Sequence, residues 1–264
     1  VDGVLKNTMS TNGPVGINNT SADLLIGSYN DEGVENFVGT LDEVRIYNYS
    51  LTNEQIGRLC LNEDRLVYSS KLENDATDSS RYANDGTVHG SSSAWVAGHT
   101  GNAIALANSG DFVQIPDSPS LSVTGDITIA AWIKCDDWLN GCNIVSKGGN
   151  NAYRFRVKSD GTLWFYLNDG INYQPYHSGV VIDHEWRHVA VTANFSENEV
   201  QFYVDGISKK TMSITGPTGL HDASTDLFIG TFDDRGIENF IGNIDEVRIY
   251  SHCLTEGQIH YLYS

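Results

Sequence analysis

The chain has 264 residues, of which 34 are acidic and 16 are basic, so its formal net charge is −18. A surface of this sign repels phosphate backbones, and we therefore expect no nucleic-acid partner. No apolar run approaches the ~20 residues that a membrane-spanning helix needs, so no membrane span is expected.

The opening segment, residues 1–61, recurs at the end of the chain as residues 204–264. The two copies align without a gap, and about half of the aligned pairs are identical. The densest match joins residues 39–47 (GTLDEVRIY) to residues 242–250 (GNIDEVRIY). Self-similarity of this kind indicates a repeat architecture. We predict two units: residues 1–61, the C-terminal part of one repeat, and residues 62–264, a complete domain.

The opening unit contains too few strands to close a sandwich by itself. Its apolar runs at 24–27 (LLIG) and 44–47 (VRIY) predict strands, and Thr52 predicts an N-capped helical turn. Strands with open edges are templates for pairing with another chain. We expect a second molecule or a tandem neighbour to complete this unit, with self-association through residues 1–61.

The complete domain is a series of short runs in which apolar and polar residues alternate. Gly, Asn, Asp and Ser separate the runs, and Asp-Gly pairs suit tight hairpin turns. A period of two predicts antiparallel strands with one face on a core, and their regular spacing predicts an all-β sandwich. The clearest runs are residues 127–133, 153–157, 163–167, 188–192 and 200–204. A second N-capped turn is predicted after Thr255.

Nine segments follow one another in an order and spacing that is typical of a known family. They are 66–68 (LVY), 78–87 (DSSRYANDGT), 101–104 (GNAI), 112–116 (FVQIP), 129–133 (IAAWI), 144–148 (IVSKG), 185–190 (EWRHVA), 203–206 (YVDG) and 242–250 (GNIDEVRIY). Through them residues 65–264 resemble the laminin-G-like (concanavalin A-like) jelly-roll domains, and residues 1–61 match the last third of the same pattern. The resemblance implies an antiparallel β-sandwich of two curved sheets, an extracellular or cell-surface location, and a glycan or extracellular protein as partner.

The resemblance also implies a calcium ion between the first and last strands. Asp245 corresponds to a typical ligand, while Asp78 and Asn84 lie in the matching amino-terminal loop. Carboxylate and amide oxygens are ligands that Ca²⁺ prefers. Asp is disfavoured in strands, so Asp245 is unusual as a plain strand residue. The alternative is that Asp245 caps a turn or pairs with Arg248.

Aromatic side chains in loops are the candidates for sugar contact. Trp138, Tyr173 and Tyr176 lie in polar surroundings, and such rings offer an apolar face with a polar edge. Packing within the loops is the equal alternative. The strand tryptophans Trp132 and Trp164, and also Trp186, are assigned to the core.

The four cysteines predict two disulfides. Cys135 and Cys142 flank a short loop, and Cys60 and Cys253 bracket the first and last strands of the complete domain. An even and pairable count favours an oxidising compartment.

The chain lacks the sequence patterns of the common hydrolases. It has no Glu-x-Asp-x-x-Glu strand, no His-Glu-x-x-His helix and no Gly-x-Ser-x-Gly elbow. We therefore predict a binding protein, not an enzyme: an extracellular, calcium-stabilised carbohydrate-binding or adhesive module of a tandem-repeat protein. The first alternative is a structural repeat of a self-assembling fibre, sheath or surface layer without a sugar ligand. The second is an accessory domain of a glycoside-degrading enzyme.

Overall fold

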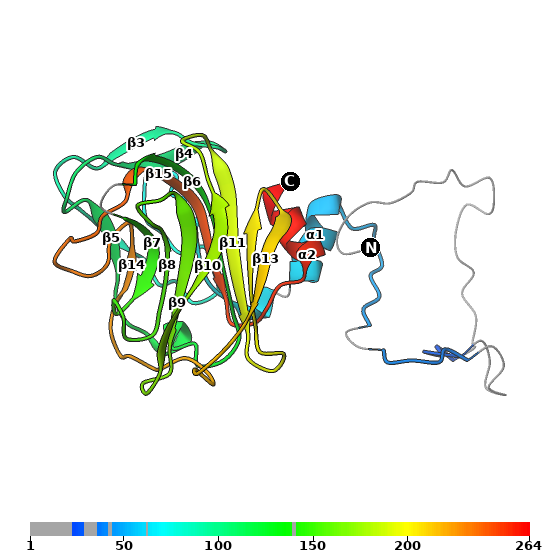
Figure 1. Ribbon diagram of the computed structural model, residues 1–264. Coiled ribbons are helices and arrows are strands. Elements are labelled where there is room, and N and C mark those ends of the chain that lie inside the picture. The colour runs from blue at the N-terminus through cyan, green and yellow to red at the C-terminus, as the bar shows by residue number, and fades with distance from the viewer. Residues whose placement is uncertain (1–22, 29–35, 42–43, 62, 139–140) are drawn as a thin grey trace.

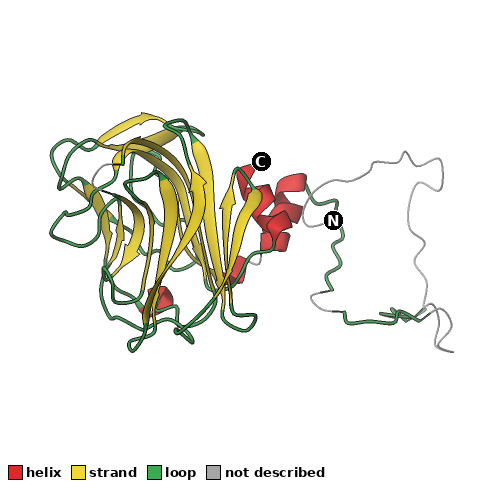
Figure 2. Ribbon diagram, in the orientation of Figure 1, coloured by secondary structure: helices red, strands yellow, loops and turns green. Residues whose placement is uncertain are grey.

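The computed structural model describes residues 23–28, 36–41, 44–61, 63–138 and 141–264. They form two antiparallel β-sheets packed face to face, with two helices on the outer side of one sheet (Figures 1 and 2). The predicted all-β antiparallel sandwich is confirmed. The helical elements are α1 (Asn53–Leu61), α2 (Glu256–Tyr263), η1 (Glu63–Arg65) and η2 (Pro119–Leu121).

Among the described residues the first sheet has eight strands, in the order β13-β12-β11-β6-β15-β4-β3 with β1 paired to β15. Their bounds are β1 Leu66–Ser70, β3 Ala94–Ala97, β4 Asn102–Leu106, β6 Ile127–Asp137, β11 Arg187–Asn194, β12 Glu199–Val204, β13 Ile207–Ser213 and β15 Ile241–Tyr250. The last strand, β15, therefore lies in the middle of the sheet, beside the first.

The second sheet has seven strands within the same described part of the chain, in the order β10-β9-β8-β7-β14-β5-β2. Their bounds are β2 Thr87–His89, β5 Phe112–Ile115, β7 Cys142–Lys147, β8 Tyr153–Val157, β9 Thr162–Asn168, β10 Tyr173–Val181 and β14 Leu227–Ile229. Alternate side chains of both sheets fill the space between them. Phe155 and Phe165, for example, are fully buried there, with ring centroids 6.2 Å apart.

A second, smaller apolar cluster lies on the outer face of the first sheet, beneath α2. Thr255 caps α2 with a complete capping box, as the sequence predicts, and Ile259 turns inward. Leu61 of α1 joins this cluster, and α1 lies beside α2 (Figure 1). The cluster consists of Leu61, Ala130, Ala190, Tyr203, Tyr250, Leu254, Ile259 and Leu262.

The described residues that precede α1 contain neither helix nor strand, so the strands predicted at 24–27 and 44–47 are not formed. Their repeat equivalents are β14 and the end of β15. Those strands pair with β1, β5, β6 and β7, and residues 1–61 include no copy of these partners. Apolar side chains stay exposed as a result: Val38 is 96% exposed. The division into two units stays a prediction.

Candidate functional site

The outer face of the second sheet carries aromatic and basic side chains where β8 and β9 run side by side. Arg154 lies opposite Tyr166, and Arg156 lies opposite Trp164. Neighbouring residues of a strand point to opposite faces, so the inward positions on these strands are apolar while these four side chains point outward. From the sequence, Trp164 is predicted to lie in the core. The structure corrects this, since Trp164 is half-buried on the outer face.

Four rings on this face form an aromatic strip: His177, Trp164, Tyr166 and Tyr173. Successive centroids are 5.1, 5.9 and 5.6 Å apart, with interplanar angles of 28°, 27° and 19°. Tyr173 is 41% exposed, and its hydroxyl donates to Asn150 Oδ1 at 2.8 Å. A row of nearly parallel rings with polar edges suits the apolar face of a sugar ring. The predicted ligand residue Tyr173 thus belongs to a larger set that the sequence analysis did not identify.

Beside the strip lies an arginine pair, Arg154 and Arg156. The Nη1 atom of each donates to Glu238 Oε2 at 2.9 Å. The guanidinium of Arg154 lies between the rings of Tyr166 (4.2 Å) and Phe232 (4.8 Å), which adds cation–π attraction. Both arginines are about 5% exposed, and their Nε atoms are buried without a hydrogen-bond partner. Glu238 and Phe232 come from the segment that connects β14 to β15, which crosses over this part of the sheet.

The other two predicted ligand residues lie elsewhere. Tyr176 is 2% exposed and points into the core, where its hydroxyl accepts from Thr215 N at 3.1 Å. This placement corrects the prediction of a sugar contact, because the ring has no free face. Trp138 packs partly against the main core and stacks on His184 at 4.2 Å. It lines a separate groove of about 390 Å³.

The predicted calcium ligands Asp78 and Asn84 are engaged by the protein itself. Asp78 accepts four hydrogen bonds, from Ser69 N, Ser80 N, Ser80 Oγ and Asn84 N, at 2.7 to 2.9 Å. Asn84 donates to Val67 O, and its side-chain oxygen accepts from Ser118 Oγ at 2.7 Å. Together they fasten the loop to β1. Their oxygen atoms do not fit a cation site in this arrangement.

Asp245 is fully buried in β15 and holds a different loop. Its Oδ2 accepts from the backbone N–H groups of His99 (3.0 Å) and Thr100 (3.2 Å), while Oδ1 is buried without a partner. Burial raises the pKa of the Asp245 carboxyl to about 6. At the other end of the same loop Glu73 Oε2 accepts from Asn102 N at 2.9 Å. Glu73 is not among the site residues predicted from the sequence.

The three predicted calcium ligands are therefore separated: Asp78 and Asn84 share one loop, while Asp245 lies in β15 and binds the loop around His99. No group of three or more His, Cys, Asp or Glu side chains within the described residues is arranged to hold a metal ion. The alternative pairing of Asp245 with Arg248 is not formed, because Arg248 binds Glu246. Calcium binding stays a prediction, and of the three predicted ligands Asp245 is the one with a side-chain oxygen, Oδ1, that is buried without a hydrogen-bond partner.

The cysteines are free thiols where the structure describes them. Cys135 and Cys142 are buried with their sulfurs 3.1 Å apart. Their hydrogen bond lowers the pKa of the Cys142 thiol and raises that of Cys135. Cys253 is also free, with its sulfur 3.0 Å from Ala193 O, and the side chain of Cys60 lies outside the description. Neither predicted disulfide is confirmed.

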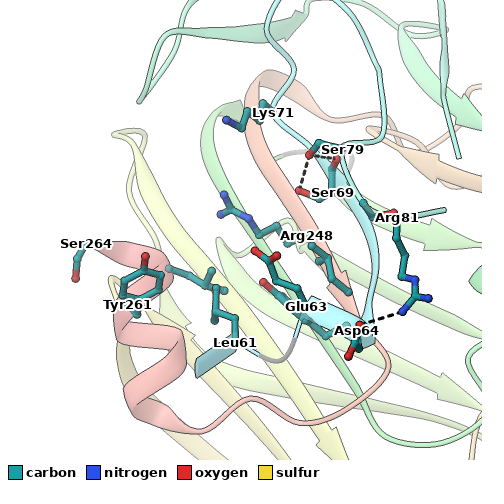
Figure 3. Close-up of a pocket in the computed structure, with 14 residues that line it drawn as sticks. Leu61, Glu63, Asp64, Ser69, Lys71, Ser79, Arg81, Arg248, Tyr261 and Ser264 are labelled. Carbon is teal, nitrogen blue, oxygen red and sulfur yellow. Dashed lines mark hydrogen bonds and ion pairs between the residues drawn. The ribbon is translucent and has the colours of Figure 1, made fainter. Parts of the chain in front are cut away.

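A groove of about 960 Å³ lies on the outer side of the first sheet, between β1, β15 and α2 (Figure 3). Charges of both signs line it. Arg81 is paired with Asp64 at 3.0 Å, with both side chains largely in solvent, and Ser79 donates to Ser69 Oγ at 3.2 Å. Pairs exposed to this degree contribute little to stability or recognition. The groove lacks the parallel ring surfaces of the second sheet.

The chain belongs to the concanavalin A-like lectin/glucanases superfamily, whose laminin G-type family description matches residues 1–57 and 107–260. Among curated proteins it is similar to Adhesion G-protein coupled receptor V1 of Danio rerio, with 28% identity over 154 residues. That match covers 54% of this chain and 2% of the receptor, so the chain spans a small fraction of that relative.

Two solved structures share the fold. One is the binding domain of Paraclostridial Mosquitocidal Protein 1, with a TM-score of 0.64 and 22% identity, over 76% of this chain and 52% of that one. The other is domain 4 of AbnA, an extracellular GH43 arabinanase of Geobacillus stearothermophilus, in complex with arabinotriose. Its TM-score is 0.62 and its identity 21%, over 76% of this chain and 98% of that one. None of the described helices is long and apolar enough to cross a membrane.

Proposed function

We infer that this protein is an extracellular, non-catalytic module that binds carbohydrate on the outer face of its second sheet. The observation that carries this inference is the aromatic strip, four nearly parallel rings beside two guanidinium groups. Ligand sites typically combine apolar and aromatic surface with a few polar groups that fix orientation. Family membership and the arabinotriose-bound arabinanase domain with the same fold add support.

In this proposal the aromatic strip provides most of the affinity for the sugar, and hydrogen bonds from the arginine pair fix the orientation of the bound sugar. Trp164 and Tyr173 are the partly exposed aromatic rings of the strip, with Lys158 Nζ 3.9 Å from the Trp164 ring, and a sugar that stacks on them removes apolar C–H surface from water. The guanidinium groups border the strip, with Arg154 4.2 Å from the Tyr166 ring, and a sugar reaches them where the Glu238 side chain moves aside. An oligosaccharide that spans from Trp164 to Tyr173 suits this surface, because Tyr166 between them is buried beneath Arg154.

The test is a glycan array with the full chain, followed by titration calorimetry with the best ligand. Trp164→Ala and Tyr173→Ala each remove one ring of the strip, and we expect a loss of roughly tenfold or more in affinity for each. Tyr82→Ala is the matched control, because Tyr82 is also 41% exposed but lies in the loop after Asp78. Equal binding by all three variants contradicts the proposed site.

Calcium is proposed at Asp245, beside the 98–102 loop. The buried, unpartnered Oδ1 of Asp245 supports this site, since carboxylate oxygens are ligands that Ca²⁺ prefers. Asp78 and Asn84 are no longer part of it. When bound, the ion supplies positive charge that compensates the buried carboxylate and holds the loop against β15.

The second candidate function is that of a structural repeat that associates through residues 1–61. Its support is the exposed apolar surface in the described part of this segment, where Leu24, Val38 and Ile46 are 72%, 96% and 70% exposed. Burial of such surface is worth roughly 25 cal/mol for each Å². Sedimentation of the full chain and of a deletion of residues 1–61 separates the candidates. Concentration-dependent association that the deletion removes supports the structural role, and a monomer in both forms contradicts it.

A further inference from the structure

We propose that the arginine pair is a carboxylate-binding site, that the side chain of Glu238 occupies it in the absence of ligand, and that the carbohydrate bound on the strip carries a carboxylate group. This inference rests on the proposed carbohydrate site and names its substrate class. It begins from an arrangement that packing alone does not require: two guanidinium groups, both largely buried, share a single carboxylate oxygen.

The hydrogen bonds of the pair are incomplete. Each guanidinium has five N–H donors in a fixed fork, and a carboxylate accepts from such forks in a bidentate manner. Glu238 Oε2 receives one Nη1 bond from each arginine, but both Nε atoms are buried without a partner. The side-chain oxygen of Asn143 is also buried without a partner, and Asn143 lies opposite Arg156 in the sheet. A group that brings two oxygens and a hydroxyl donor satisfies these atoms better than Glu238 does.

Glu238 is held so that its side chain can leave while its backbone stays. Its carbonyl oxygen accepts from Asn143 Nδ2 at 2.6 Å and from Asn143 N at 3.3 Å, which fixes the main chain against β7. The side chain, in contrast, is 39% exposed, and it lines an adjoining groove of about 440 Å³. The backbone of Glu238 is in the left-handed region at φ +50°, which is rare for a residue other than Gly, Asn or Asp. A ligand carboxylate can therefore replace that of Glu238 by rotation of one side chain.

The charge around the pair is opposite to that of the whole molecule. Arg154 and Arg156 are joined by Lys158, whose Nζ lies 3.9 Å from the Trp164 ring. The acidic groups near this basic cluster are Glu238, Asp137 along the adjoining groove, and Asp160, which accepts from Thr162 Oγ1 at 2.6 Å beside Lys158 and Trp164. In a chain with a net charge of −18, this basic group on an aromatic surface favours an anionic sugar over a neutral one. A planar carboxylate is the anion that fits, because the pair already holds one.

The experiment compares acidic and neutral oligosaccharides with the full chain by titration calorimetry. The two acidic arms are oligogalacturonate and sialyllactose, and their neutral counterparts are galacto-oligosaccharide and lactose. The variants are Glu238→Gln, which removes the internal competitor, and the double variant Arg154→Gln with Arg156→Gln. Glu246→Gln is the matched control, because Glu246 is also left-handed and paired with an arginine, Arg248, but lies on the first sheet. Melting curves establish that each variant is folded.

We expect the unmodified chain to prefer at least one acidic ligand, and Glu238→Gln to raise that affinity roughly tenfold, since a tethered carboxylate competes at a millimolar effective concentration. The neutral ligand and Glu246→Gln should show no such gain, and the double arginine variant should lose the preference. Equal binding of acidic and neutral sugars in every variant overturns this inference and leaves the proposed carbohydrate site standing. Absence of binding to any sugar, by the unmodified chain and by Glu238→Gln, overturns both.

Discussion

The buried carboxylate of Asp245 predicts an unusual dependence of stability on pH when calcium is absent. Burial raises its pKa from 3.8 to about 6 in the folded chain. The folded state therefore binds more protons than the unfolded state between these two values, so the free energy of unfolding falls as pH rises from 4 to 6. The change of pKa corresponds to about 3 kcal/mol, all of it lost at neutral pH.

Asp245→Asn removes this penalty, because an amide oxygen still accepts from the N–H groups of His99 and Thr100. In the presence of EDTA at pH 7 we expect the variant to melt roughly 10 °C above the unmodified chain, and the difference to vanish near pH 4. Burial lowers the pKa of His188 to about 3, which acts in the opposite direction over the same range. The difference between the two proteins at each pH is therefore the quantity to measure, by calorimetry or circular dichroism.

Calcium should reverse the order of the two melting temperatures, so that the unmodified chain melts above Asp245→Asn. An ion bound to the ionised carboxylate stabilises the unmodified chain at pH 7 by ~2.7 kcal/mol at a hundredfold excess over its dissociation constant, and it should not stabilise Asp245→Asn. Equal melting of both proteins in EDTA at pH 7 would refute the reasoning about burial. Equal stabilisation of both by calcium would refute the proposed metal site.

Three further predictions concern the packing of the domain. Ile259→Ala should cost about 3 kcal/mol in the free energy of unfolding by urea, because Ile259 is fully buried between α2 and the first sheet. Gly57→Ala should release α1 from α2, because a Cβ at this position would lie 2.0 Å from the ring of Tyr261. Proteolysis of the opening segment should then increase, and adding Tyr261→Ala to the same chain should restore protection. Mild oxidation should join Cys135 to Cys142, whose sulfurs are 3.1 Å apart, and four free thiols in non-reducing peptide mapping would contradict this.

The sequence predicts the sandwich well because its strands carry a period of two that the core enforces. It predicts less well which residues face outward. Side chains alternate between the two faces of a strand, and which alternate set faces the core is fixed only once the strand has paired with its neighbours. The run 163–167 shows this. Phe165 pairs with the inward Phe155, so Trp164 is on the outer face despite its apolar character. By the same rule Tyr176 lies opposite Phe165 and is buried, whereas Tyr173 lies outside.

The sites also depend on contacts between segments that are far apart in the chain. Glu238 reaches Arg154 across 84 positions, and Asp245 reaches His99 across 146. Nothing local in the sequence indicates either pairing. The loop of residues 98–102 is held at one end by Asp245, which accepts from His99 N, and at the other by Glu73, which accepts from Asn102 N. Asp78 does not take part in this, because it fastens its own loop to β1.

The most direct test of the proposed site is a titration of the full chain with whichever of oligogalacturonate and sialyllactose binds more tightly in calorimetry, followed through the indole N–H signals of its five tryptophans in a nitrogen–proton NMR spectrum. We predict that the signal of Trp164, which donates to Thr162 Oγ1 at 2.8 Å, shifts in a saturable manner while those of Trp132 and Trp138 stay in place. A saturable shift at Trp138 with Trp164 unchanged would contradict it, because the ligand would then occupy the groove at the edge of the sandwich and not the outer face of the second sheet.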